Sequence, residues 1–192
     1  MSLFKRLTGL QPAAPLPYVE NTVVAGQASL SIRYLGTAGF VVSDGTHTVV
    51  LDPYVTRPDL LTSLTRPLVP DADLIAALMP EADDVLIGHA HHDHILDGPE
   101  LCRQTGARLI GSSSTAMVGR AAGLPETQLV ETAGREDIAS GTWTLRGFPS
   151  RHGRIFGRIP FPGDLHAPPP WPPRMHQLKH GLVLNWLLDT GP

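Results

Sequence analysis

The 192-residue sequence predicts an α/β fold. Three observations predict it: strand-like alternation over residues 30–51, alternating strand and helix patterns over residues 74–131, and a histidine-rich tract directly after a buried apolar run. Strands and helices that alternate along a chain are typical of a sheet covered by helices. The length suits a single domain with one sizeable core.

The ends and the composition set the boundaries of this prediction. Residues 1–28 are expected to be an irregular N-terminal lead-in, and residues 29–192 the folded domain. The apolar run near the N-terminus is too short for a signal peptide or a membrane span, so a cytoplasmic location is the default expectation. The formal charge is −3 without a basic block, which gives no indication of nucleic-acid binding. The single cysteine, Cys102, excludes an intramolecular disulfide.

The first folded segment has the pattern of a β-meander. Positions 30, 32 and 34 are apolar and alternate with polar positions, which is the period of a strand with one buried face. Asp44-Gly45 is a hairpin turn signal, and the returning strand ends at Asp52. Asp52 therefore stands at a strand end, either as a functional carboxylate or as a turn residue before Pro53.

The rest of the chain is predicted from apolar periodicity and from cap and turn residues. We expect a loop over residues 54–70, helices over 74–79, 99–104 and 112–122, strands over 108–111, 128–131, 142–149 and 181–188, and a turn at Asp189. Residues 155–175 are rich in proline and are expected to form a stiff loop. Its apolar side chains could line the mouth of a site or lie on the surface: Phe156, Phe161, Trp171 and Met175.

The segment Gly88–His94 reads G-H-A-H-H-D-H and follows the strand-like residues 84–87. Neutral imidazole nitrogens with one carboxylate oxygen suit zinc, or iron or manganese in the same geometry. His89 and His91 can turn toward one ion, while Asp93 and His94 can turn toward a second ion. The alternative is a solvated histidine-rich loop that binds metal adventitiously.

The spacing His-x-His-x-Asp-His resembles the metallo-β-lactamase-fold hydrolase superfamily. The resemblance implies an αββα sandwich, with the N-terminal portion present and the second half incomplete. It also implies that His152, which follows a strand, is the third ligand of the first ion beside His89 and His91. Ser150-Arg151-His152-Gly153-Arg154 is loosely similar to the branch that includes the ascorbate-phosphate lactonase and N-acyl phospholipase D-type enzymes.

The resemblance also implies roles for two carboxylates. Asp52 matches the aspartate that lies behind the metal-bound histidines, orients them and raises their basicity. Asp93 is a ligand of the second ion and is also the catalytic candidate, because it can orient the nucleophile. One departure from the superfamily pattern stands out: no histidine follows His180, and Asp189 is the only acidic residue after Asp164. We interpret Asp189 as a turn residue, with the aspartate that bridges both ions in the superfamily as the alternative, and expect the chain to correspond to the N-terminal two-thirds of the fold.

Two functions follow from these residues. The first is a metal-dependent hydrolase that uses a metal-activated water on an ester, lactone, amide or phosphodiester bond of a small-molecule substrate. The alternative is a non-catalytic or mononuclear metal-binding domain without a complete dinuclear site. Zinc, as one or two ions, is the expected cofactor. A homo-oligomer or a completing subunit is a candidate partner, because the last strand would otherwise expose an apolar edge.

Overall fold

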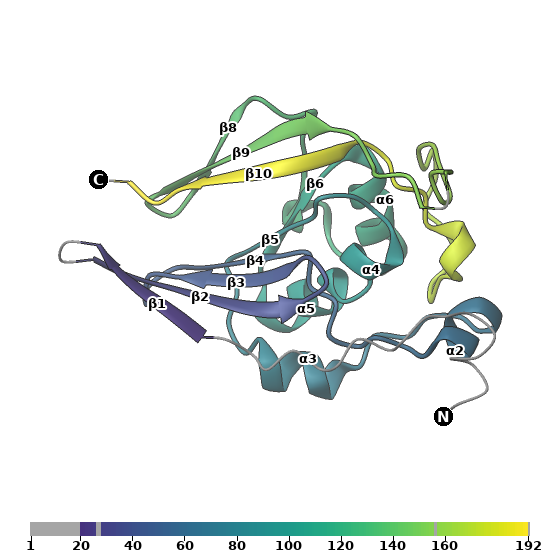
Figure 1. Ribbon diagram of the computed structural model, residues 1–192, viewed down its shortest axis with the longest axis horizontal. Helices are drawn as coiled ribbons and strands as arrows, with labels where there is room; N and C mark the ends of the chain where they lie inside the picture. Colours follow the sequence, from purple (N-terminus) through teal and green to yellow (C-terminus); the bar gives the residue numbers. More distant parts are fainter. Residues whose placement is uncertain (1–19, 26–27, 156, 192) are drawn as a thin grey trace.

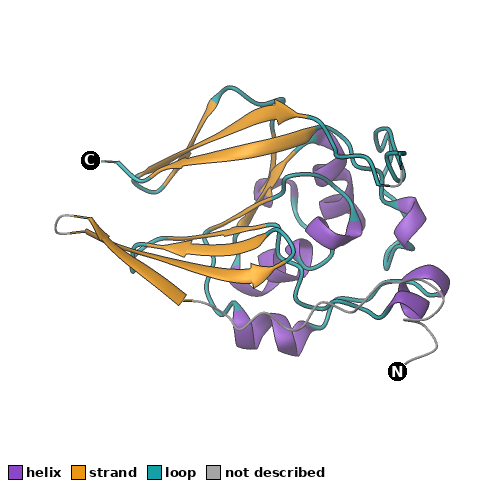
Figure 2. Cartoon of the chain, viewed as in Figure 1, coloured by secondary structure: helices purple, strands orange, loops and turns teal. Residues whose placement is uncertain are grey.

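The computed structural model describes residues 20–25, 28–155 and 157–191 of the chain. Two β-sheets face one another, and helices cover the outer face of the larger sheet (Figures 1 and 2). Three layers of the predicted αββα sandwich are therefore present in the described part of the chain, which confirms the α/β fold class. A helical layer outside the smaller sheet is not among the described residues.

The larger sheet has seven strands in sequence order. The strands are β1 (Glu20–Ala25), β2 (Ala28–Gly36), β3 (Gly39–Ser43), β4 (Thr48–Leu51), β5 (Asp84–Leu86), β6 (Arg108–Gly111) and β7 (Leu129–Glu131). The pairs from β1 to β4 are antiparallel, and those from β4 to β7 are parallel. Parallel neighbours need crossover connections, and these carry the helices that cover one face.

The smaller sheet has three antiparallel strands in the order β10-β9-β8. They are β8 (Asp137–Ser140), β9 (Trp143–Ser150) and β10 (Val183–Asp189). The sequence predicted β9 and β10 and missed β8, which has only two apolar residues. In register, Val183 pairs with Ser150, so the end of β9 and the start of β10 lie side by side.

One expected region differs in the structure. Residues 20–25, which we expected to belong to an irregular lead-in, form β1 and pair antiparallel with β2. The short strand was missed because its apolar positions are few and do not alternate with polar ones. Residues 1–19 lie outside the described part, and the division at residue 28 stays a prediction.

Helices α3, α5 and α6 occupy the expected places. The helices of the described chain are α2 (Leu60–Thr65), α3 (Ala72–Leu78), α4 (His92–Ile95), α5 (Gly98–Thr105) and α6 (Ser113–Ala121), with short 3-10 turns η1 (Glu126–Gln128) and η2 (Met175–Gln177). Side chains of Asp71 and Ser112 cap α3 and α6 by accepting from backbone N–H groups. Helix α2 lies within the predicted loop 54–70. Its leucines are exposed, so no periodic buried face was there to predict it.

The larger sheet has an apolar core on each face. Alternate strand residues point to opposite faces, so Val50 and Val85 contact the helical side while Val49 and Leu86 contact the smaller sheet. Trp143 of β9 is almost fully buried between the two sheets. Of the helices in the described residues, none is long and apolar enough to cross a membrane.

Candidate metal centre

The histidine tract lies where β5 of the large sheet meets the start of β10 of the small sheet. Backbone hydrogen bonds hold this junction, because Leu184 N donates to Gly88 O at 2.7 Å and Ala90 N donates to His180 O at 2.9 Å. A Cβ on Gly88 would lie 2.9 Å from Asp52 Oδ2 and 3.3 Å from Leu184 O. Glycine is therefore needed at position 88 for this close approach.

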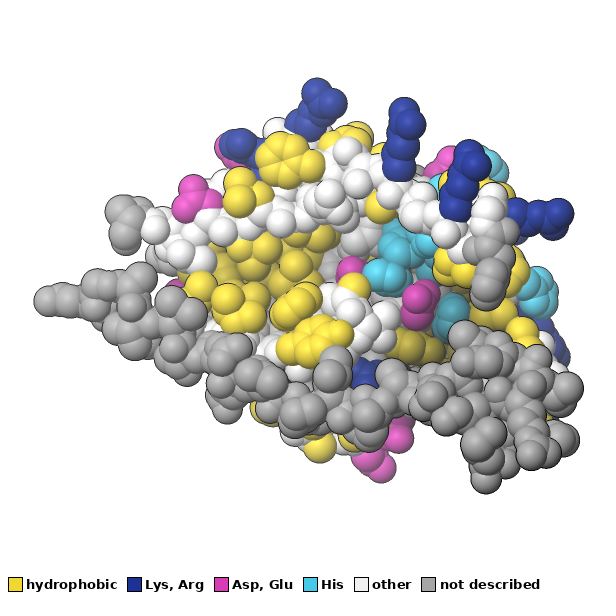
Figure 3. Space-filling model, viewed as in Figure 1, with side chains coloured by type: hydrophobic (Ala, Val, Ile, Leu, Met, Phe, Trp, Pro, Cys, Tyr) yellow, Lys and Arg dark blue, Asp and Glu magenta, His cyan; other side chains and the backbone are white. Residues whose placement is uncertain are grey.

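Histidine side chains gather beside acidic side chains at one end of the seam between the sheets (Figure 3). The ligand atoms of His89, His91 and His152 lie within 4.8 Å of one another. Their ring centroids are 4.7 to 4.8 Å apart in all three pairs. Three imidazoles on a tetrahedral ion at zinc–nitrogen distances would have ring centres about 5 Å apart. The spacing of the three rings thus fits a single zinc-sized ion.

The nitrogen atoms of these rings also suit a cation. His89 Nε2 and His91 Nδ1 face each other at 3.0 Å, and both lone pairs could bind one ion. His152 Nδ1 donates to the carbonyl of Gly153 at 2.5 Å, which leaves its Nε2 as the free ligand atom. His91 Nε2 is buried without a hydrogen-bond partner among the described residues. This atom is not the nitrogen that faces His89, so the case for His91 as a ligand rests on the position of its Nδ1.

A second group of possible ligands shares His89 with the first group. Its members are His89, Asp93 and His94, again with ligand atoms within 4.8 Å of one another. His94 Nδ1 donates to Asp52 Oδ2 at 2.8 Å, and Asp52 Oδ1 accepts from Gly88 N at 2.6 Å. The bond to Asp52 leaves His94 Nε2 free on the side of Asp93, whose carboxylate lies 3.8 Å away.

The protonation of these histidines depends on burial and on Asp52. Burial, together with the neighbouring imidazoles, lowers the pKa of His89 to about 2 and that of His91 to about 4. Burial acts against the charged form of His94 as well, but the hydrogen bond and the negative charge of Asp52 outweigh it, so the pKa of His94 is raised. His89 and His91 are therefore neutral at pH 7, which is the form that binds metal.

The structure thus brings all six predicted site residues together around two adjoining positions, with Asp52 behind His94. The roles of the other five as metal ligands, and of Asp52 as the group that orients them, remain our proposal. His92, which the sequence did not assign, turns away from the other rings and packs edge-on against Tyr54, with centroids 5.8 Å apart.

Asp189 lies far from both groups. It is the last residue of β10 and pairs with Thr144, whereas the site adjoins the opposite end of the strand at Val183. Six strand residues span about 20 Å. Its carboxylate instead accepts from the backbone N–H of Gly191 at 3.0 Å. The interpretation of Asp189 as a turn residue agrees with this position.

The sequence did not assign His180, yet this histidine lies beside the first group. Its ring centroid is 5.8 Å from that of His91 and 6.0 Å from that of His152. The antiparallel pairing of the two predicted strands could have identified His180. His152 follows β9 and His180 precedes β10, and antiparallel pairing of these strands puts such positions next to each other.

Among its described aromatic residues, the proline-rich loop contributes one side chain to the site. Phe161 packs edge-on against His91, with ring centroids 6.3 Å apart. Met175 instead packs against a small core of Tyr54, Leu68 and Leu96. Phe156 lies outside the described residues.

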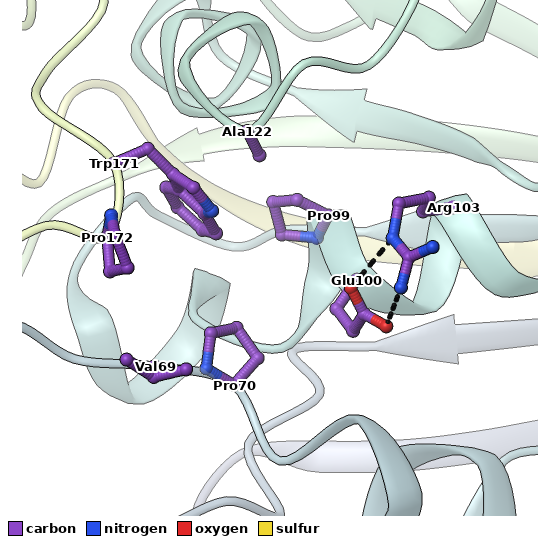
Figure 4. A pocket seen from close by; sticks show the side chains of 8 residues that line it. All are labelled: Val69, Pro70, Pro99, Glu100, Arg103, Ala122, Trp171 and Pro172. Atoms are coloured by element: carbon purple, nitrogen blue, oxygen red, sulfur yellow. Dashed lines mark hydrogen bonds and ion pairs between the residues drawn. The ribbon is translucent and has the colours of Figure 1, made fainter.

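Trp171 lines a separate pocket, and none of the residues that line this pocket is a histidine (Figure 4). In Figure 4 its ring faces Pro99, and the ion pair between Glu100 and Arg103 closes one side. The pocket is lined by Val69, Pro70, Pro99, Glu100, Arg103, Ala122, Trp171 and Pro172. The expected apolar wall at the metal mouth is therefore limited to Phe161 among the described aromatic residues of the loop.

A second polar cluster has the connectivity of a serine hydrolase triad but not its chemistry. His47 Nε2 lies 2.6 Å from Ser140 Oγ, and His47 Nδ1 lies 3.2 Å from Asp83. However, Ser140 is only 1% exposed, and its hydroxyl donates to the buried carboxylate of Asp84. Arg108 binds the same carboxylate with two nitrogens. The cluster therefore joins the two sheets and offers no accessible nucleophile.

Curated proteins with similar sequences are metal-dependent hydrolases. The chain is 32% identical over 105 residues to a UPF0173 metal-dependent hydrolase of Anaeromyxobacter dehalogenans; the match covers 54% of this chain and 35% of that protein. This chain thus spans about a third of the length of that relative. No family model matches the sequence.

Solved structures define the fold. Igni18, a metallo hydrolase from Ignicoccus hospitalis, matches with a TM-score of 0.54 and 18% identity, over 84% of this chain and 57% of that one. CmlA from Streptomyces venezuelae, a diiron β-hydroxylase, matches with a TM-score of 0.51 and 19% identity, over 93% of this chain and 29% of that one. The chain has the fold of the metallo-β-lactamase superfamily, as its sequence predicted. Within that superfamily, its sequence is similar to the UPF0173 metal-dependent hydrolases.

Proposed function

We propose that this chain carries the metal centre of a metal-dependent hydrolase acting on a small molecule. His89, His91 and His152 would hold the first ion, and Asp93 and His94, with His89 between the two groups, would begin a second site. The observation that carries the proposal is the pair of ligand groups that share His89. The proposed metal is zinc, with iron or manganese as alternatives, and the proposed location is the cytoplasm.

A zinc-class ion held by three histidines lowers the pKa of a bound water to about 7 and polarises a carbonyl or phosphoryl oxygen. The protein's own residues prepare this chemistry. Asp52 fixes the His94 ring by accepting from Nδ1, and the Gly153 carbonyl does the same for His152. Asp93 is the least buried carboxylate of the site, with 40% of its side chain exposed, so it can reach and orient an incoming nucleophile.

The susceptible bond belongs to the class that such a centre hydrolyses, namely an ester, lactone, amide or phosphodiester. The proposal extends to this class as a whole. Similarity to the UPF0173 relatives supports hydrolysis, and the diiron neighbour indicates that iron can occupy the same fold.

A second candidate is a mononuclear or non-catalytic metal-binding domain. One observation favours it: among the described residues, Asp93 is the only carboxylate in either ligand group, and Asp189 lies at the far end of β10. The first group would then bind an ion on its own. In this candidate the chain is stable with the first site alone, or a second copy or another subunit completes the second site.

Metal content and turnover separate the two candidates. The purified chain is loaded with zinc, dialysed and analysed for bound metal, and hydrolysis of p-nitrophenyl acetate and bis(p-nitrophenyl) phosphate is followed. About two zinc ions per chain with turnover that His91→Ala abolishes supports the hydrolase. One ion without turnover supports the mononuclear domain, and absence of metal from the wild-type chain contradicts both. His176→Ala, on an exposed histidine outside the site, is the matched control.

A further inference from the structure

His180 is held against the metal loop by its own backbone. Its carbonyl accepts from Ala90 N at 2.9 Å, and its N–H donates to Phe161 O at 3.3 Å. The residue is thus fixed between the histidine tract and the proline-rich loop. Its side chain is partly exposed, so a molecule that reaches the site can contact it.

The ring of His180 lies slightly farther from the rings of His91 and His152 than a ligand of the same ion would. Its centroid is 5.8 Å from His91 and 6.0 Å from His152, whereas the three rings of the first group are 4.7 to 4.8 Å apart. A fourth imidazole on the same tetrahedral ion would lie about 5 Å from each of the others. His180 is therefore about 1 Å too far out to complete the coordination.

Three protein ligands leave one position open on a tetrahedral ion. His180 contacts the outer edge formed by His91 and His152. We propose that His180 is a positioning residue for the group that occupies this open position. The proposal rests on the proposed function, in which His89, His91 and His152 hold an ion.

The hydrogen bonding of His180 defines what it can recognise. Its Nδ1 donates to the carbonyl of Gly181, which leaves Nε2 as the ring atom that can accept a hydrogen bond. No described residue donates to this atom. Such a ring accepts a hydrogen bond from an N–H or O–H of the bound molecule. The substrates it favours carry a donor next to the oxygen that approaches the metal, as amides and hydroxy compounds do.

Two hydroxamates test this recognition directly. Acetohydroxamate and N-methylacetohydroxamate offer the same two oxygens to a metal, but only the first has an N–H. The full chain is loaded with cobalt, and each compound is titrated while the visible absorption of cobalt is recorded. We divide the dissociation constant of N-methylacetohydroxamate by that of acetohydroxamate. We expect this ratio to be about two- to tenfold larger in the wild-type chain than in His180→Ala, which corresponds to the contribution of one hydrogen bond.

Three variants separate this role from others. His180→Gln keeps an acceptor near the position of Nε2 and is expected to restore part of the preference. His176→Ala, four residues earlier and exposed, is expected to leave it unchanged. His180→Ala is expected to bind cobalt with the same stoichiometry and within about threefold of the wild-type affinity, since a residue outside the coordination does not hold the ion.

Each remaining outcome overturns the proposal. An equal ratio in the wild-type chain and in His180→Ala excludes the hydrogen bond. Loss of cobalt binding in His180→Ala, with an intact circular dichroism spectrum, makes His180 a ligand instead. If the wild-type chain binds no cobalt, the proposed function fails first, and that result is distinct from the other two.

Discussion

Acidification should destabilise the metal-free protein well before its carboxylates protonate. The experiment lowers the pH from about 7.5 to about 5. His89 and His91 have folded-state pKa values of about 2 and about 4, against 6.5 for an ordinary histidine. Because their pKa values are lowered by folding, the unfolded chain binds more protons at pH 5. The stability they contribute is complete above pH 6.5 and is lost as the pH falls below it.

The magnitude follows from the same values. A pH of about 5 lies about 1.5 units below the ordinary pKa of histidine. Protonation at this pH therefore lowers the free energy of an unfolded histidine by about 2 kcal/mol. Two such imidazoles give about 4 kcal/mol, and His92, whose pKa is also lowered by burial, acts in the same direction. His94 acts in the opposite direction, because its raised pKa gives stability that is present at low pH and is lost as the pH rises through the folded value. The expected net loss in the free energy of unfolding is therefore about 2 to 4 kcal/mol.

Urea unfolding followed by tryptophan fluorescence measures this loss. The protein is first freed of metal by chelation, and the free energy of unfolding is determined at both pH values. The double variant His89→Asn with His91→Asn should lose most of the pH dependence, while His176→Ala should keep it. Equal free energies at the two pH values in the wild-type protein, or an unchanged pH dependence in the double variant, would show that His89 and His91 are not the source of the acid sensitivity.

Three further substitutions test contacts that shape the site and its support. Gly88→Ala places a methyl group 2.9 Å from Asp52 Oδ2 and should cost about 1–3 kcal/mol of stability, measured by thermal unfolding. Asp97→Ala removes the acceptor of two backbone N–H groups in a fully buried place and should cost about 3 kcal/mol by urea unfolding; Asp97→Asn should cost less. Ser140→Ala leaves Asp84 without its hydroxyl donor and should lower stability by about 1–2 kcal/mol in the same assay, with zinc stoichiometry unchanged.

Much of the candidate site was predictable because its residues stand at strand ends. His89 follows β5, Asp52 follows β4 and His152 follows β9, and each strand has a clear apolar pattern. The parallel pairing of β4 with β5 then brings Asp52 beside Gly88. The apolar periodicity of each strand shows where the strand ends. The order of the strands in the sheet then brings these ends together.

Other features depend on contacts between distant segments, and the sequence carries no local signal for them. His180 belongs to the site only because β10 pairs with β9 and its first residues bind the metal loop. Trp171 was expected at the metal mouth or on the surface, and it lines a pocket beside α5. A proline-rich segment has no period, so neither its path nor its contacts could be derived from the pattern of its residues.

The first ligand group has a structural consequence that the second does not share. His89 and His91 extend from the large sheet, while His152 extends from the small sheet. An ion bound by these three residues would join the two sheets at one end of the seam. At the other end, the sheets are joined by Asp84 of β5 together with Ser140 of β8. The Asp93 group, in contrast, comes entirely from the tract after β5. Metal in the first position should therefore stabilise the packing of the sheets, and metal in the second position should affect chemistry more than stability.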